Sequence, residues 1–293
     1  MKIIKELKRK GLDIEWVCLK IPLIYYWLGI FRFCLSQNYK APIPLGICKI
    51  INCSVFLEGY GLKFMMVASA ILCIMYLFDI KMKWTTLGLF CLSIILFTSE
   101  ESSGVLNRNG ILSFLFLSQA FAYWFNGSNL NKLKYSRIQY SIQAIIVGYF
   151  LSACSKLLDS GLCWANDGFR ITLQVLKSFH YNYYTTLNGS ELLKADEIVH
   201  FLSEYQNVLI GLLIFSLMLE FFALTAAINR GYARVYGIAL LFMHIGIYFF
   251  MDIIIISFVV PMVFVLINPL FLAVLLYNKI FRKPILPLTF KPR

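Results

Sequence analysis

Charged residues are scarce in this chain: Asp, Glu, Lys and Arg make up 14% of its 293 residues, whereas soluble globular domains carry about 25%. Hydrophobic residues make up 60% of the chain, and its mean hydropathy is +0.74. This composition excludes a water-soluble globule, because too few polar residues remain to cover its surface. The sequence therefore predicts an all-α, polytopic integral membrane protein embedded in a lipid bilayer.

The chain also lacks the short motifs that mark common chemical sites. It contains no CxxC, HExxH, Gly-rich phosphate loop or GxSxG, and no residues with metal-ligand spacing, so we expect no metal. Its eight cysteines fall mostly within apolar runs, where a thiol behaves as a small hydrophobe. We expect no disulfide framework, because Cys48 and Cys53 could pair only if the backbone between them is not a regular helix.

Long apolar runs predict the transmembrane organisation, since a helix needs about 20 apolar residues to cross a hydrocarbon core roughly 30 Å thick. We expect a helical bundle of about eight spans, within a range of seven to nine. The run at 45–58 is too short and mixed to assign, and it could be re-entrant, interfacial or part of a span. The expected spans lie near 14–36, 62–80, 84–99, 110–125, 139–158, 201–228, 233–251 and 254–278.

These runs predict a single transmembrane domain at 14–278, flanked by basic tails at 1–13 and 279–293. Connections on one side are short and rich in Lys and Arg, whereas the other side holds the long connection 159–200, expected as an outer loop. The positive-inside rule therefore predicts a multi-pass protein of the inner (cytoplasmic) membrane with both termini cytoplasmic. The first run carries no small-residue cleavage site, so we expect a retained anchor.

The net charge of +12 would suggest nucleic acid as the partner of a soluble protein. Here the basic residues are confined to short connections and tails, so no nucleic-acid partner is expected. The basic residues predicted to be cytoplasmic are Lys2, Lys5, Lys8, Arg9, Lys10, Lys81, Lys83, Lys132, Lys134, Arg137, Arg230, Arg234, Lys279, Arg282, Lys283, Lys291 and Arg293.

Ionisable residues within the apolar runs are candidate functional residues, because a charge in hydrocarbon costs several kcal/mol. We expect Lys20 and Arg32 to snorkel to headgroups and Asp252 to lie in a solvated turn. The stronger candidates are Lys156, Glu220 and His244. We expect Glu220 and His244 to pair with each other or with Lys156, forming a polar cluster between helices.

Lys156 follows Ser152 and Tyr149 at spacings of four and seven, which places all three on one helical face. A partly desolvated lysine amine can act as a base or nucleophile. The alternative is a lysine that snorkels outward beside Asp159. For Glu220 and His244 the separate alternative is a protonated, hydrogen-bonded carboxyl and a neutral donor between helices.

Several short motifs occur in an order that resembles a known family. They are Tyr149 to Leu157 with Trp164 and Gly168; Asn107 to Gly110 with Gln119; Glu220, Arg230 or Arg234, and Met243-His244; and Asn268 to Phe271. The chain is similar to the HTTM (horizontally transferred transmembrane) family, which includes the membrane domain of vitamin K-dependent gamma-carboxylase. The resemblance covers roughly 45–278 and rests on the order and spacing of these motifs.

The resemblance implies that Lys156 is a catalytic base working with Glu220 and His244. It also makes Tyr149, Trp164, Asn109 and Gln119 candidates for substrate binding. The carboxylase base deprotonates vitamin K hydroquinone, so the family implies a quinone-like lipid as cofactor.

Asn109 stands where the family has a histidine, and the carboxylase's large lumenal domain has no counterpart here. The segment from Pro44 to Cys48 and the chain length look closer to small bacterial members of the sporulation-delaying protein B type, which are implicated in maturing a secreted peptide toxin.

Three functions remain open on the sequence. The first is an enzyme that matures a secreted peptide, or acts on a quinone-like lipid, at the outer leaflet. The second is a transporter or export component with polar residues along its path. The third is a noncatalytic partner that binds a peptide through the aromatic-rich segment 159–200, whose aromatics an interfacial belt would also explain.

Overall fold

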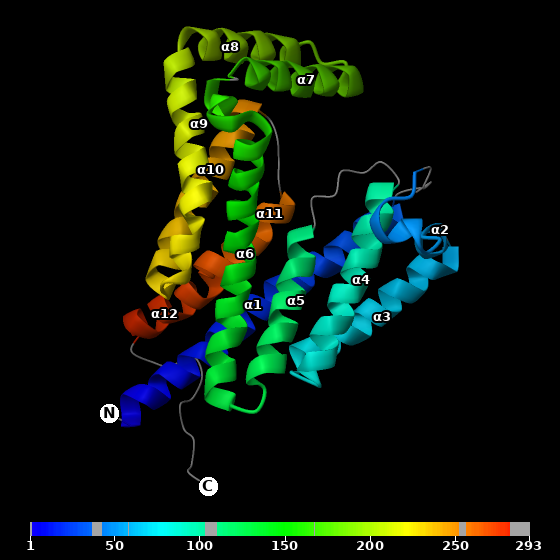
Figure 1. The fold of residues 1–293 in the computed structure, drawn as a ribbon, viewed down its shortest axis with the longest axis vertical. Helices are drawn as coiled ribbons and strands as arrows, with labels where there is room; N and C mark the ends of the chain where they lie inside the picture. The colour runs from blue at the N-terminus through cyan, green and yellow to red at the C-terminus, as the bar shows by residue number, and fades with distance from the viewer. Residues whose placement is uncertain are drawn as a thin grey trace. The chain divides into compact units, whose positions relative to one another are not determined.

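The computed structural model describes residues 2–36, 43–57, 59–102, 110–166, 168–251 and 256–281, and within these ranges it contains helices and no strand (Figure 1). Seven of the described helical stretches are long and apolar enough to cross a membrane: Gly11–Arg32, Gly59–Leu77, Met82–Ser102, Leu130–Ser160, Gln206–Ala227, Arg230–Phe250 and Ile256–Asn278. The predicted all-α membrane architecture is confirmed. The remaining expected span corresponds to α5 (Gly110–Asn126), which has 17 described residues.

The chain divides into two compact units, and the division falls within two of its helices. Unit 1 comprises 1–145 and 260–293, and unit 2 comprises 146–259. Unit 1 contains α1 (Lys2–Ser36), η1 (Gly46–Lys49), α2 (Ser54–Leu57), α3 (Gly59–Leu77), α4 (Met82–Ser102), α5, the first half of α6 (Leu130–Ser160), the end of α11 (Ile256–Met262), η4 (Val263–Ile267) and α12 (Pro269–Phe281).

An aromatic core holds unit 1 together around Trp27 of α1, which is fully buried. Its ring meets Phe31, Phe97 and Phe116 edge to face, with centroids 5.1 to 5.8 Å apart. Such pairs contribute beyond the area they bury. The indole N–H of Trp27 also donates a hydrogen bond to Ser69 of α3, so α1 is fixed to α3, α4 and α5 by one residue.

Asn268 joins the two chain segments that make up unit 1. Its backbone is left-handed, with φ of 52°, a conformation that asparagine tolerates better than most residues. Its Oδ1 accepts the N–H of Phe271 in the first turn of α12, and its Nδ2 donates to the Glu15 carbonyl of α1 at 3.0 Å. One side chain therefore starts the last helix and fastens it to the first.

Lys20 does not snorkel, so that prediction is wrong. Its side chain is 2% exposed. Its Nζ donates to Asp79 Oδ2 at 2.9 Å and to the carbonyls of Tyr76 and Leu77 at 3.2 and 2.9 Å. The end of α3 and the turn after it therefore provide the hydrogen-bond acceptors for the ammonium group, which was expected to reach lipid headgroups instead. Arg32 is exposed, and Asp252 lies outside the described residues.

Cys48 and Cys53 form a disulfide, which corrects the expectation that the cysteines are not paired. The segment 45–58 contains the short helices η1 and α2 with a turn between them, and Leu45, Cys48 and Phe56 make turn-type backbone hydrogen bonds. Because the backbone between the cysteines is not a regular helix, their Cα atoms come within 5.1 Å. Among the described residues, Cys18, Cys73, Cys91, Cys154 and Cys163 are free.

Unit 2 contains the end of α6, η2 (Gly161–Asn166), α7 (Gly168–Thr186), α8 (Ser190–Glu204), α9 (Gln206–Phe221), η3 (Phe222–Ala227), α10 (Arg230–Met251) and the start of α11. The expected outer loop 159–200 is therefore largely helical. Figure 1 shows α7 and α8 side by side, lying across the end of α9.

The α7–α8 hairpin is held by the apolar faces of two amphipathic helices. Val175 and Phe179 of α7 are four residues apart and pack against Ala195 and Leu202 of α8. This spacing gives each helix one apolar stripe. Leu209 of α9 and Phe250 of α10 complete the cluster, so the hairpin is anchored on the two helices that carry Glu220 and His244.

Candidate functional site

An ion pair between Lys156 of α6 and Glu220 of α9 lies within the apolar helices of unit 2. The lysine Nζ donates to both carboxylate oxygens, at 2.7 and 2.6 Å. The Glu220 side chain is 7% exposed and that of Lys156 is 26% exposed. The carboxylate is thus the buried partner, and the amine is the partner that a second molecule can reach.

A second polar pair joins Tyr149 of α6 to His244 of α10. The tyrosine hydroxyl and the His244 Nε2 are 2.8 Å apart, and Tyr149 is 3% exposed. Phe258 meets the tyrosine ring edge to face at 6.0 Å. The other imidazole nitrogen, Nδ1, is buried and has no hydrogen-bond partner among the described residues.

The two pairs lie along one face of α6. Tyr149 and Lys156 are seven residues apart, or about 10 Å along a helix axis. Each pair includes one residue of α6. We call the four side chains Tyr149, Lys156, Glu220 and His244 the unit 2 cluster.

Glu220 sits where α9 changes its winding. The helix ends at Phe221, and the N–H of Phe222 is shared between the carbonyls of Glu220 and Met218 as the chain tightens into η3. A 3₁₀ segment is a common way for an α-helix to end. The last residues of α9 thus combine a buried carboxylate with an irregular backbone.

Acid–base chemistry is available to this arrangement, because an amine and a carboxylate are in direct contact at 2.6 Å. An ion pair taken out of water has a desolvation cost, which the contacts between its two members offset. Of the two groups, the amine is the more exposed.

The structure brings together four of the residues singled out in the sequence. Pairing of Glu220 with Lys156 is confirmed. His244 bonds to Tyr149 instead of the expected Glu220 or Lys156. Asp159, offered as the alternative partner of Lys156, accepts a hydrogen bond from Ser155 at 3.1 Å.

Gln119 belongs to unit 1, where it is fully buried. Its amide oxygen accepts from the Tyr76 hydroxyl at 2.8 Å, and its Nε2 donates to Ser141 at 3.1 Å. These two hydrogen bonds link α5 to α3 and α6 within the core of unit 1. Asn109 and the side chain of Trp164 lie outside the described part of the chain.

Sequence reasoning missed the carboxylates Asp13 and Asp79. Asp13 accepts hydrogen bonds from Lys134 and Arg137, and Asp79 accepts one from Lys20. The available signal was that each acid lies at a span end beside a basic connection. Among the described residues, no three His, Cys, Asp or Glu side chains come together as a metal-binding group.

No protein-family model, curated protein or solved structure matches this chain. The described helices define an all-α, multi-pass membrane protein, with a Lys–Glu ion pair between two of its apolar helices.

Proposed function

We propose that this protein is a membrane enzyme of the HTTM type that acts on a secreted peptide, or on a quinone-like lipid, with Lys156 as its base. The observation that carries the proposal is the ion pair between Lys156 and the buried Glu220. The order of motifs in the sequence supports the choice of family. A noncatalytic role remains the competing proposal below.

In the proposed reaction Glu220 is a positioning residue that takes the ammonium proton of Lys156. The neutral amine then removes a proton from the substrate, which binds on its exposed side. Because Glu220 holds both the lysine and its proton, it sets the direction in which the amine points. General bases of this kind typically contribute 10²–10⁴-fold to rate.

Tyr149 and His244 form the second polar pair of the proposed site. The buried Nδ1 of His244 is a polar atom with no described partner, and such an atom fits an oxygen of a bound molecule. A quinone-like lipid carries polar oxygens on an otherwise apolar ring, so His244 and Lys156 are the residues that would hold it. When bound, such a group would supply redox chemistry.

We also propose that both termini are cytoplasmic and that the membrane is the inner membrane of a bacterium. The basic connections support this orientation. The Cys48–Cys53 disulfide supports it independently, because disulfides persist on the oxidising side of such membranes. The turn that follows α3, with Lys81, and the start of α4, with Lys83, are then cytoplasmic.

Mass spectrometry of small secreted peptides tests the enzyme proposal. Cells carrying the wild type, Lys156→Ala, Glu220→Gln or no protein are compared. We expect a peptide mass shift, or the maturation of a peptide, with the wild type, its loss in Lys156→Ala and a partial loss in Glu220→Gln. Lys177→Ala is the matched control, since Lys177 is an exposed lysine of α7 in the same unit.

Lipid extracts of the same cells, analysed for quinone content and redox state, form the second arm of this experiment. A change that requires Lys156 in either arm supports the proposal and selects the substrate. Full conversion by Lys156→Ala, with the variant present in the membrane, would show that Lys156 is not the base.

The competing proposal is a noncatalytic partner, or export component, that binds a peptide through the α7–α8 hairpin. The observation that favours it is a set of exposed apolar side chains on the hairpin: Tyr181, Tyr184, Leu187 and Leu193 are each at least 66% exposed. Copurification of a secreted peptide of unchanged mass, lost in Tyr181→Ser/Tyr184→Ser but kept in Lys156→Ala, would select this function.

A further inference from the structure

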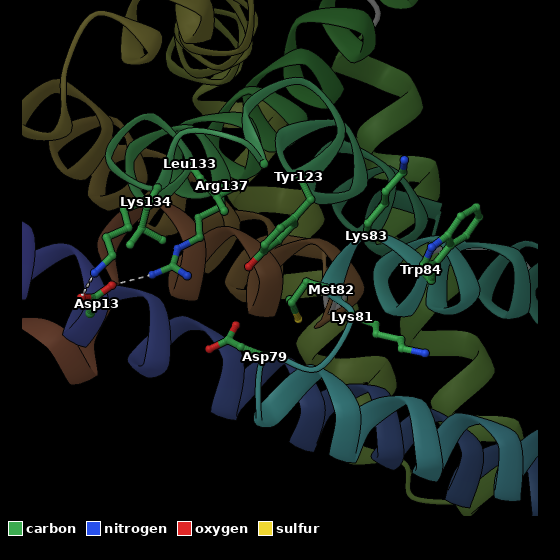
Figure 2. Close-up of a pocket in the computed structure, with 12 residues that line it drawn as sticks. Asp13, Asp79, Lys81, Met82, Lys83, Trp84, Tyr123, Leu133, Lys134 and Arg137 are labelled. Atoms are coloured by element: carbon green, nitrogen blue, oxygen red, sulfur yellow. Dashed lines mark hydrogen bonds and ion pairs between the residues drawn. The ribbon is translucent and has the colours of Figure 1, made fainter.

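Unit 1 contains a cavity of about 790 Å³ that the proposed function does not use. Figure 2 shows its lining: Asp13 of α1, Asp79 and Lys81 of the α3–α4 turn, Tyr123 near the end of α5, and Lys134 and Arg137 of α6. Its volume lies within the range of small-molecule sites, about 300–1,000 Å³. In the sequence these basic residues belong to two separate predicted connections. In the structure they line the same cavity.

The charge of the lining is positive. Four lining residues are basic and two are acidic. Asp13 already bonds to Lys134 and Arg137, and Asp79 to Lys20 and to the Trp16 indole N–H. Lys81 and Lys83 have no carboxylate partner among the described residues, so they supply the excess positive charge.

One buried donor of the lining lacks a hydrogen-bond partner among the described residues. It is the Nε of Arg137, a residue that is 7% exposed. The Tyr123 hydroxyl is also buried and lies within reach of Arg137 and Asp79, with no hydrogen bond of good geometry to either. In Figure 2 this hydroxyl points toward the side chain of Arg137. Buried donors of this kind are costly unless a ligand or water accepts from them.

The cavity lies at one end of the spans. Its lining comes from the turn between α3 and α4 and from the connection between α5 and α6, where residues leave the apolar core. Trp84 and Trp124 are exposed beside it, and the Lys83 Nζ lies 5.4 and 5.1 Å from their ring centroids. Tryptophan and lysine at a span end are typical of headgroup depth.

From this geometry we infer that the cavity binds a phosphate-bearing anion, with a phospholipid headgroup as its source. Arg137 and Tyr123 donate hydrogen bonds to phosphate oxygens, and Lys81 and Lys83 contribute the positive charge that attracts it. Arginine and lysine are the side chains suited to phosphate, and basic pockets between membrane helices bind anionic headgroups. This site is independent of the unit 2 cluster.

Native mass spectrometry of the delipidated full-length protein in neutral detergent tests the inference. Palmitoyl-oleoyl phosphatidylglycerol and the zwitterionic phosphatidylcholine with the same chains are titrated separately. Glycerol phosphate and inorganic phosphate are titrated by calorimetry to detect a soluble source. The variants are Lys81→Gln/Lys83→Gln and Tyr123→Phe, with Lys132→Gln and Tyr25→Phe as matched controls at exposed positions of unit 1 outside the cavity.

We expect the wild type to bind phosphatidylglycerol at least tenfold more tightly than phosphatidylcholine. The double lysine variant should weaken phosphatidylglycerol binding about 30-fold, at about 1 kcal/mol per basic residue. Tyr123→Phe should weaken it about fivefold, because one hydrogen bond is lost. Both controls should bind as the wild type does.

A third result is that glycerol phosphate or inorganic phosphate binds with the same dependence on the variants, while phosphatidylglycerol does not bind. The cavity would then be a site for a soluble phosphate and not for a lipid headgroup. Equal binding of the two lipids without phosphate binding would overturn the inference. So would an effect of Lys132→Gln as large as that of the double variant, since it would reveal unspecific attraction. Tyr123→Phe removes a single oxygen atom and keeps the test decisive if the lysine variant is poorly folded.

Discussion

Each unit holds a lysine within apolar helices, and the two lysines are solvated differently. In unit 1 Lys20 is 2% exposed and bonds to a carboxylate and two helix-terminal carbonyls. In unit 2 Lys156 is 26% exposed and faces a carboxylate that is itself buried. The ammonium group of Lys20 is therefore surrounded by protein, whereas that of Lys156 is accessible to another molecule.

The same contrast extends to the neighbouring polar groups. The core amide of unit 1, Gln119, is bonded through both its oxygen and its nitrogen. The core imidazole of unit 2, His244, is bonded through one nitrogen and leaves the other without a described partner. Satisfied buried networks stabilise a fold, whereas a group left short of a partner is typical of a site. Burial of an ionisable residue in a membrane protein therefore does not by itself indicate function.

The largest expected effect on stability is that of Lys20→Met. It removes the donor to the last carbonyls of α3 and to Asp79, so we expect a loss of about 3 kcal/mol, the upper end of the range for leaving a buried acceptor without its partner. Thermal unfolding in detergent, followed by circular dichroism, measures it. Lys63→Met, at an exposed position of α3, should lose little. Equal losses for Lys20→Met and Lys63→Met would show that Lys20 does not hold unit 1 together.

Removal of the disulfide should have the next largest effect. Cys48→Ser/Cys53→Ser opens a short loop in unit 1, and the chain-entropy model gives about 2 kcal/mol for a loop of this length. The control Cys163→Ser changes an exposed free thiol of unit 2 and should have no effect. Alkylation before and after reduction, read by peptide mass spectrometry, verifies the bond. Alkylation of Cys48 and Cys53 without reductant would contradict it.

Gln119→Leu separates a structural from a substrate-binding role for this residue. The change leaves the Tyr76 hydroxyl without its acceptor, so we expect a stability loss of about 1.5 kcal/mol. Peptide maturation per folded molecule should be unchanged. Gln143→Leu, at an exposed position of α6, is the control. Normal stability with lost maturation would instead restore the substrate-binding interpretation.

Tyr149→Phe should have the smallest effect on stability. Hydrogen bonds between membrane helices are worth about 0.6 kcal/mol on average, and this variant removes only the one to His244. If the unit 2 cluster is catalytic, peptide maturation should fall by more than this small loss explains. Tyr181→Phe changes an exposed hydroxyl of α7 and serves as the control. A stability loss like that of Lys20→Met would place Tyr149 among the structural residues.

The spans and the Lys156–Glu220 pair could be predicted from the sequence because both follow from the cost of charge in hydrocarbon. A carboxylate within an apolar run needs a partner, and few candidates exist. The partner of His244 could not be predicted, because a tyrosine hydroxyl is compatible with apolar runs and carries no compositional signal. Lys20 was misjudged for a related reason: its acceptors are backbone carbonyls and an aspartate 59 residues away in the chain.

The helices α7 and α8 and the disulfide were missed because both lie in segments that hydropathy treats as connections. An amphipathic helix buries only one stripe, as Val175 and Phe179 do, so its average hydropathy stays low. Cys48 and Cys53 are brought together by turns that cannot be predicted from the spacing of the two residues. Membrane hydropathy thus predicts the spans well and the structures between them poorly.

The bond from Asn268 to the Glu15 carbonyl has a consequence for synthesis of the chain. The contact joins residues 253 positions apart, and all of unit 2 is encoded between the two segments of unit 1. Unit 1 therefore cannot be completed until the ribosome has synthesised all of unit 2. During that interval the first 145 residues lack the last helix of their unit. A nascent chain that stops before residue 268 lacks the side chain that bonds to the Glu15 carbonyl of α1.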